Sequence, residues 1–100
     1  MQQRPVRNQL FQHQDGGFYR YLGMARHTED QTPLVIYEHV WPFDTDGDPW
    51  ARPASEWGSR FKLVSERDLA AAVGQDRQAT QDAIKQAKAE RRAREAAAKA

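Results

Sequence analysis

The residues best suited to acid-base chemistry in this chain are gathered in the segment 26–29. Arg26, His27, Thr28 and Glu29 place a cation, an imidazole, a hydroxyl and a carboxylate side by side. A histidine oriented by a carboxylate can act as a general base, but consecutive residues point in different directions, so Glu29 does not automatically reach His27. Two readings stay open beside catalysis: these side chains satisfy the backbone of a loop, or they contact a ligand.

Aromatic residues at even spacing suggest a second kind of chemistry, the binding of planar or charged groups on a sheet. The evenly spaced rings are Tyr19 and Tyr21 on one expected strand and Tyr37 and Trp41 on another, and Trp50 and Trp57 follow beyond the expected hairpin. Aromatic rings stack on bases and surround cations, while an arginine such as Arg52 recognises phosphates or carboxylates. Arg52 either projects into a ligand groove or forms a buried ion pair. From their alternation, we assign the core to Phe18, Leu22, Leu34, Ile36 and Phe61.

Alternating aspartates in the segment 44–50, DTDGDPW, resemble the first half of a calcium loop. Such a loop needs glycine at its sixth position and a bidentate glutamate at its twelfth, where this chain has Pro49 and Ser55. Asp46-Gly47 instead indicates a hairpin turn. The three histidines, at positions 13, 27 and 39, have no short ligand spacing. We therefore expect no metal site and no cofactor.

Short extended segments must position these side chains. Residues 10–13, 17–24 and 34–41 have the composition of strands, with a tight turn at Asp15-Gly16-Gly17, and two more short strands are expected around Ala51 and Phe61. Ser65 and Asp68 have the spacing of a helix N-terminal capping box, and Gly74 is a stop signal. The pattern predicts a mainly β fold, a small antiparallel barrel of about five short strands with a C-terminal helical extension.

Four ordered motifs carry a resemblance to a known family. The segments GFYRYLGMARHTEDQTPLVIYEHV (17–40), WARP (50–53) and Arg60-Phe61 resemble the small bacterial family catalogued as domain of unknown function 1653, over roughly Phe11 to Val64. The resemblance implies a small barrel of the SH3-like type, and His13 with Gly16 or Gly17 match a family position after the first aromatic. The segment between WARP and Arg60 is shorter than is usual in the family. The resemblance implies no particular activity.

Composition divides the chain of 100 residues into unequal parts. All ten Phe, Trp and Tyr lie between Phe11 and Phe61, and residues 1–84 carry nine Lys/Arg against twelve Asp/Glu, while residues 85–100 carry six against two. We expect a flexible N-terminus (1–8), an SH3-like barrel domain with a short closing helix (9–74) and a basic, Ala-rich helical tail (75–100). Without cysteine, an apolar span or a signal peptide, the default prediction is a cytoplasmic protein that does not enter a membrane.

These observations favour a non-enzymatic binding module for a protein or nucleic-acid partner. The expected binding surface is formed by Tyr19, Tyr21, Arg26, His27, Glu29, Tyr37, Trp50 and Arg52. One alternative is a small hydrolase or nucleotide-processing enzyme that uses the segment 26–29. Another is a structural subunit whose tail docks on a partner. The tail could also lie on nucleic acid or on the acidic body of the same chain, and the sequence does not predict an oligomeric state.

Overall fold

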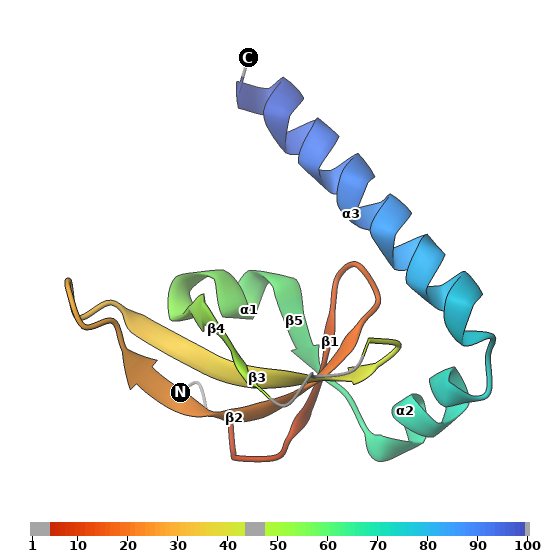
Figure 1. Ribbon diagram of the computed structural model, residues 1–100, viewed down its shortest axis with the longest axis horizontal. Helices are drawn as coiled ribbons and strands as arrows, with labels where there is room; N and C mark the ends of the chain where they lie inside the picture. Colours follow the sequence, from red (N-terminus) through yellow and green to blue (C-terminus); the bar gives the residue numbers. More distant parts are fainter. Residues whose placement is uncertain (1–4, 44–47, 100) are drawn as a thin grey trace.

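Five antiparallel strands form one sheet in the computed structural model, which describes residues 5–43 and 48–99 (Figure 1). The elements are, in chain order, β1 (Leu10–His13), β2 (Phe18–Arg26), β3 (Pro33–Trp41), β4 (Trp50–Pro53), the 3-10 turn η1 (Ala54–Glu56), α1 (Trp57–Arg60), β5 (Phe61–Leu63), α2 (Glu66–Val73) and α3 (Arg77–Lys99). The strand order in the sheet is β4-β3-β2-β1-β5. All the strands that we expected are therefore present, and the predicted turn at Asp46-Gly47 lies outside the described residues.

The sheet is open, so the predicted closed barrel is not observed. β4 and β5 are its two edges, and no ladder joins them in the described part of the chain. Between these strands the chain coils into η1 and α1 and lies on one face of the sheet, as Figure 1 shows. With three helices beside the sheet, the fold is mixed α and β rather than mainly β.

Aromatic side chains build the core between the sheet and α1. The core cluster consists of Phe11, Tyr21, Val35, Tyr37, Trp57 and Phe61. The rings of Trp57 and Phe61 stack at 3.9 Å between centroids and are nearly parallel, and Phe11 meets Trp57 edge-on at 5.2 Å. Aromatic rings bury more apolar surface than any other side chain. Six residues from five elements can therefore hold this small sheet together.

The core lies on the opposite face of the sheet from the one we expected. The predicted alternation is observed, since Tyr19 and Tyr21 share a face of β2. In β3, however, the buried residues are Val35 and Tyr37, and not Leu34 and Ile36 as we expected. The predicted core residues Phe18 and Phe61 are confirmed as buried, at 4% and 7% exposure, and Phe61 belongs to the core cluster. The covered face is decided by where α1 places Trp57, a long-range contact that strand periodicity does not encode.

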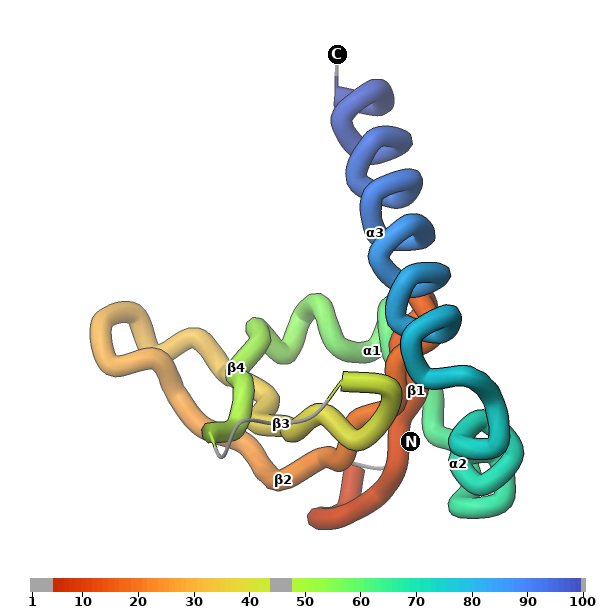
Figure 2. The backbone as a smooth tube through the Cα atoms, turned by 45° about the vertical axis from the view of Figure 1, so that its right-hand side comes forward, coloured from red at the N-terminus to blue at the C-terminus, as the bar shows by residue number. Residues whose placement is uncertain are grey.

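Both predicted helical segments are confirmed, and their ends follow local chemistry. The Ser65 hydroxyl accepts a hydrogen bond from the Asp68 backbone N–H at 3.1 Å, and the Asp68 carboxylate accepts one from the Ser65 N–H at 2.9 Å. This reciprocal capping box starts α2, which ends at Val73 before Gly74. α3 then runs past the β1–β2 hairpin, and its C-terminal end projects beyond the sheet (Figures 1 and 2). Within the described residues, no helix combines the length and apolar character needed to cross a membrane.

Replacing Phe61 by alanine tests the aromatic core. We expect Phe61→Ala to lower the free energy of unfolding by about 3–5 kcal/mol, because it removes the ring stacked on Trp57 and leaves a cavity. The measurement is urea unfolding followed by circular dichroism. Val6→Ala is the control, since Val6 is 63% exposed, and we expect a change within about 0.5 kcal/mol. Equal unfolding midpoints for the two variants would contradict this account of the core.

Candidate functional site

A cavity of about 300 Å³ lies between the sheet and α3, and charged and titratable side chains converge on it. The strands contribute His13, Tyr19, His39 and Arg52, the connecting segments contribute Asp15 and Phe43, and α3 contributes Ile84, Lys85, Lys88 and Arg91. Residues more than 70 positions apart in the chain thus line one hollow. The cavity exists only because α3 lies against the sheet.

A buried ion pair attaches α3 to the β1–β2 hairpin. Arg91 donates from Nε to Asp15 Oδ1 at 3.1 Å and from Nη2 to Asp15 Oδ2 at 3.0 Å, and both side chains are about nine-tenths buried. Burial alone would raise the pKa of the Asp15 carboxyl, but its hydrogen bonds from Arg91 and the nearby charge of Lys88 hold that pKa below its usual value. Asp15 is therefore ionised, and the two-pronged contact orients the helix.

Three further contacts position the start of α3. Ile84 packs against Gly16, where an added Cβ would lie 3.3 Å from Ile84 Cγ1 and where φ is +117°. The Gln81 side chain donates a hydrogen bond to the Pro42 carbonyl at 2.9 Å. The Arg77 guanidinium lies 4.9 Å above the ring of Trp41. Ile84 is the one large aliphatic residue of the tail, and its burial is the apolar part of this contact.

His13 is an uncharged member of the cavity wall. Burial lowers the pKa of its imidazole to about 4, the nearby Arg52, Arg91 and Arg60 act in the same direction, and Asp15 opposes them. Its Nδ1 accepts a hydrogen bond from the Asp15 backbone N–H at 3.0 Å, so the neutral ring carries its proton on Nε2. The 3.4 Å approach of Asp15 Oδ2 to Nδ1 is therefore not an ion pair at neutral pH.

Tyr19 brings a neutral hydroxyl to the cavity. Its ring packs on those of His39 and Phe61, at 4.7 Å and 5.4 Å between centroids, and burial raises the pKa of the phenol to about 12. Gly17 lies beneath this hydroxyl, since an added Cβ there would come within 2.9 Å of it. Tyr19 lines the cavity, and no hydrogen-bond partner of its hydroxyl is found in residues 5–43 and 48–99.

Arg52 supplies a cation whose hydrogen-bonding capacity is largely unused. Its guanidinium lies 5.6 Å above the ring of Phe61, and Nη1 is 3.4 Å from Glu56, a carboxylate that also serves Arg60 at 3.5 Å. Its buried Nε has no hydrogen-bond partner among the described residues. Two arginines share one carboxylate here, which leaves positive charge at the cavity.

The wall as a whole is cationic. Within residues 5–43 and 48–99, four cations line the cavity with one carboxylate, Asp15; the cations are Arg52, Lys85, Lys88 and Arg91. His13 and Tyr19 have pKa values moved away from neutrality in opposite directions, so neither exchanges a proton readily near pH 7. Fixed cations with neutral hydrogen-bonding groups are suited to holding an anion.

The predicted binding residues do not form one surface. Tyr21 and Tyr37 are 5% and 6% exposed and belong to the core, which corrects their assignment to an accessible face. They are buried because α1 covers the side of the sheet to which they point. Tyr19 and Arg52 line the cavity. Trp50 is 54% exposed and its ring lies 5.6 Å from that of His39, next to the cavity.

The remaining predicted residues, Arg26, His27 and Glu29, lie in and beside the β2–β3 hairpin, at the end of the sheet away from α3 (Figure 1). His27 Nδ1 accepts a hydrogen bond from the Glu29 backbone N–H at 3.1 Å, and the other side chain near Nδ1 is Asp30 at 3.6 Å. The Glu29 carboxylate is not paired with the imidazole in the described structure. The loop is satisfied locally, and the carboxylate beside the imidazole belongs to Asp30 rather than to the predicted Glu29.

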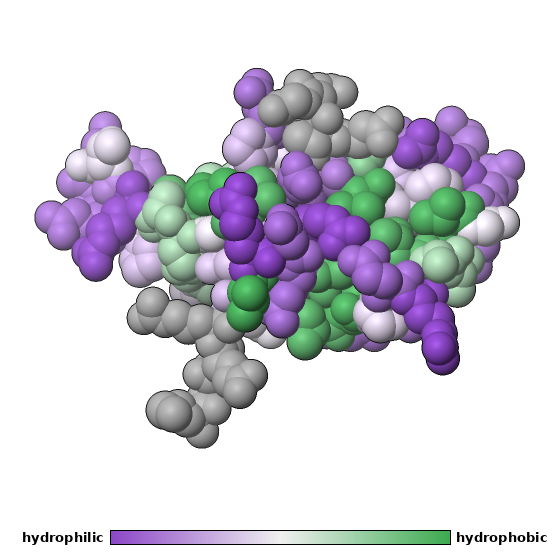
Figure 3. Space-filling model, turned by 90° about the horizontal axis from the view of Figure 1, so that it is seen from below, coloured by the Kyte–Doolittle hydropathy of each residue, from purple (hydrophilic) through white to green (hydrophobic). Residues whose placement is uncertain are grey.

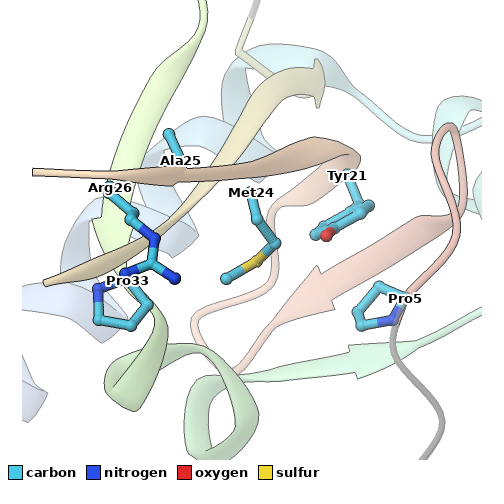
Figure 4. Close-up of a pocket in the computed structure, with 6 residues that line it drawn as sticks. All are labelled: Pro5, Tyr21, Met24, Ala25, Arg26 and Pro33. Carbon is cyan, nitrogen blue, oxygen red and sulfur yellow. The ribbon is translucent and has the colours of Figure 1, made fainter. Parts of the chain in front are cut away.

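A larger groove of about 460 Å³ lies beside this end of β2 (Figure 4). Met24 lies at the centre of the groove, with Tyr21 and Pro5 on one side and Arg26 and Pro33 on the other. Figure 3 shows hydrophobic side chains gathered among polar ones on the face seen from below. Among the described residues of this lining, Arg26 is the only charged one. The groove offers apolar contact but no convergence of polar groups.

Sequence reasoning missed His13, Asp15, His39 and the cations of α3 as site residues. One usable signal was that Tyr37 and His39 are two residues apart in β3 and therefore lie on the same face of the sheet. His39 is also paired with the predicted site residue Tyr19 across the β2–β3 ladder. For Lys85, Lys88 and Arg91 no local signal exists, since their role depends on how α3 docks. In the part of the chain that the structure describes, no group of three or more His, Asp or Glu side chains could hold a metal ion.

The buried imidazole predicts a loss of stability in mild acid. His13 has a folded-state pKa of about 4 against an ordinary value of 6.5, so the unfolded chain binds the extra proton as the pH falls from about 6.5 to 4. We expect the free energy of unfolding to decrease across this window by about 2–3 kcal/mol. Urea unfolding at a series of pH values measures it, and His13→Gln should flatten the dependence. An unchanged slope in that variant would remove His13 as the cause.

A double-mutant cycle measures how firmly α3 is attached. Asp15→Asn and Arg91→Gln should show a coupling of about 1–3 kcal/mol in urea unfolding, because they remove the same buried pair. The matched control is the pair Arg20 and Glu66, at 2.8 Å but with Glu66 67% exposed, for which we expect a smaller coupling. Equal couplings would show that the Asp15–Arg91 contact is no stronger than a surface pair.

Residues 9–67 match the model of the family described as "Protein of unknown function (DUF1653)". No curated protein and no solved structure matches the chain. The matched region extends from β1 to the first turn of α2 and includes the strand residues His13, Tyr19, His39 and Arg52 of the cavity, while α3 lies outside it. Because the match spans more than half of the chain, this protein belongs to the DUF1653 family.

Proposed function

We propose that this protein is a non-enzymatic binding module that takes an anionic group of its partner into the cavity between the sheet and α3. The observation that carries the proposal is the imbalance of charge in that cavity, where four cations face one carboxylate among the described lining residues. Asp15 is already occupied by two hydrogen bonds from Arg91. Arg52, Lys85 and Lys88 are thus available to a ligand.

Arg52 is the central ligand-binding residue of this proposal. Stacking on Phe61 restrains the guanidinium, so less conformational entropy is lost when it binds. Its long contact with the shared carboxylate of Glu56 leaves donors for a bidentate interaction. A phosphate and a carboxylate both fit this chemistry, and the group can belong to a nucleic acid or to a protein.

Neutral groups beside the cations support binding over catalysis. Tyr19 and His13 can donate hydrogen bonds to an anion, but their shifted pKa values make them poor proton carriers near pH 7. His27, which the hydrolase alternative used, follows directly after β2, and the β2–β3 hairpin lies at the other end of the sheet (Figure 1). The tail-docking alternative loses support from the attachment of α3 to its own chain through Asp15 and Ile84.

Titration with inorganic pyrophosphate tests the proposal. We expect saturable binding by isothermal titration calorimetry at low salt, and Arg52→Gln should weaken it by about 10-fold or more, as for the loss of a charged hydrogen bond. Arg67→Gln is the control, because Arg67 is exposed on α2 away from the cavity lining. Absence of saturable binding, or equal weakening in the two variants, would contradict an anion site at Arg52.

A further inference from the structure

We infer that the partner is a single-stranded nucleic acid, with one nucleotide in the cavity and its following phosphates along α3. This inference rests on the proposed anion site and names its ligand class. Two features of the surface carry it: a line of cations that leaves the cavity along α3, and a group of aromatic rings at the side of the cavity away from that helix.

The line of cations, called here the α3 stripe, consists of Lys85, Lys88, Arg92 and Lys99. Their spacing of three, four and seven residues places them on one face of the helix. Lys85 and Lys88 line the cavity, and Lys99 lies about 21 Å further along the helix axis than Lys85. The stripe therefore runs from the cavity toward the C-terminal end of α3, and an extended polyanion bound in the cavity could continue along it.

The cations of the α3 stripe are available for a ligand. All four are exposed, and none forms an ion pair within the described chain. The carboxylates of α3 are engaged elsewhere: Asp82 with Gln78 at 3.0 Å, Glu90 with Gln86 at 3.2 Å, and Glu95 with Arg91 at 3.3 Å. Four cations therefore share one face of the helix, and the carboxylate at the edge of that face, Glu95, is paired with Arg91, although the net charge of the chain is only +1.

Aromatic rings distinguish a nucleic acid from other polyanions. Tyr19, His39 and Phe43 line the cavity, and the exposed ring of Trp50 lies edge-on to His39 at 5.6 Å. Unpaired bases stack on such rings, whereas bases in a duplex are already stacked and hidden. An acidic peptide would use the cations without needing the rings. The rings and the line of cations together favour a single strand.

Fluorescence anisotropy with a labelled 12-nucleotide single strand tests this inference on the full-length chain. We expect binding that is tighter than that of the same sequence as a duplex or of polyglutamate, and that weakens with salt. Trp50→Ala should weaken it at least about fivefold through lost stacking. Equal affinity for the duplex or for polyglutamate would overturn the assignment to single-stranded nucleic acid.

Two arginines of the same helix provide a matched pair of variants. Arg92 belongs to the α3 stripe, while Arg94, also exposed, points to the other side of α3 because successive residues turn by about 100°. Arg92→Gln should reduce the slope of log K against log salt by about 0.7, as for one lost phosphate contact of a single strand, and Arg94→Gln should leave it unchanged. Equal effects would overturn the path along the stripe.

The pyrophosphate titration separates the two proposals. Arg92 does not line the cavity, so Arg92→Gln should bind pyrophosphate with unchanged affinity while it binds the oligonucleotide less well. Pyrophosphate binding without preferential binding of the single strand would overturn the nucleic-acid inference and leave the anion site standing. Failure of pyrophosphate to bind would overturn both.

Discussion

The buried ion pair between Asp15 and Arg91 is the interaction on which the functional geometry depends. It joins a hairpin of the sheet to the middle of α3, across 76 positions of sequence. α3 has little apolar surface of its own, with Ile84 as its one buried side chain, so hydrophobic burial contributes only modestly to its docking. The orientation of the helix, and with it the cavity, relies on polar contacts at Asp15, Pro42 and Trp41.

Aromatic packing supports this arrangement from the other side. Phe61 belongs to the core through its stack with Trp57, and it also contacts His13 at 4.7 Å and lies under the Arg52 guanidinium. The ring therefore couples the folding of the sheet to the placement of two cavity residues. The burial that stabilises the core also lowers the pKa of His13 and raises that of Tyr19. Both side chains therefore stay uncharged near neutral pH.

Charge segregation along the chain acquires meaning only in the folded protein. The excess of acidic residues before position 85 and of basic residues after it nearly cancels in the total. Docking of α3 brings Lys85, Lys88 and Arg91 to the hairpin and strands, where Asp15 is the only carboxylate of the cavity in the part of the chain that the structure describes. A nearly neutral chain can therefore present a locally cationic hollow, and local potential rather than net charge governs which partners approach it.

The sequence by itself determined the strands, the capping box at Ser65 and the helical tail. Alternation, capping and helix propensity act over a few residues, so they are visible in the local sequence. It also indicated Tyr19 and Arg52 as site candidates through their chemistry. Only the tertiary structure decided which face of the sheet is buried, since Trp57 covers the tyrosine face and removes Tyr21 and Tyr37 from the surface. It likewise decided that the sheet stays open and that His13, Asp15 and three cations of α3 share a cavity. These features arise from contacts between distant segments, which local patterns do not encode.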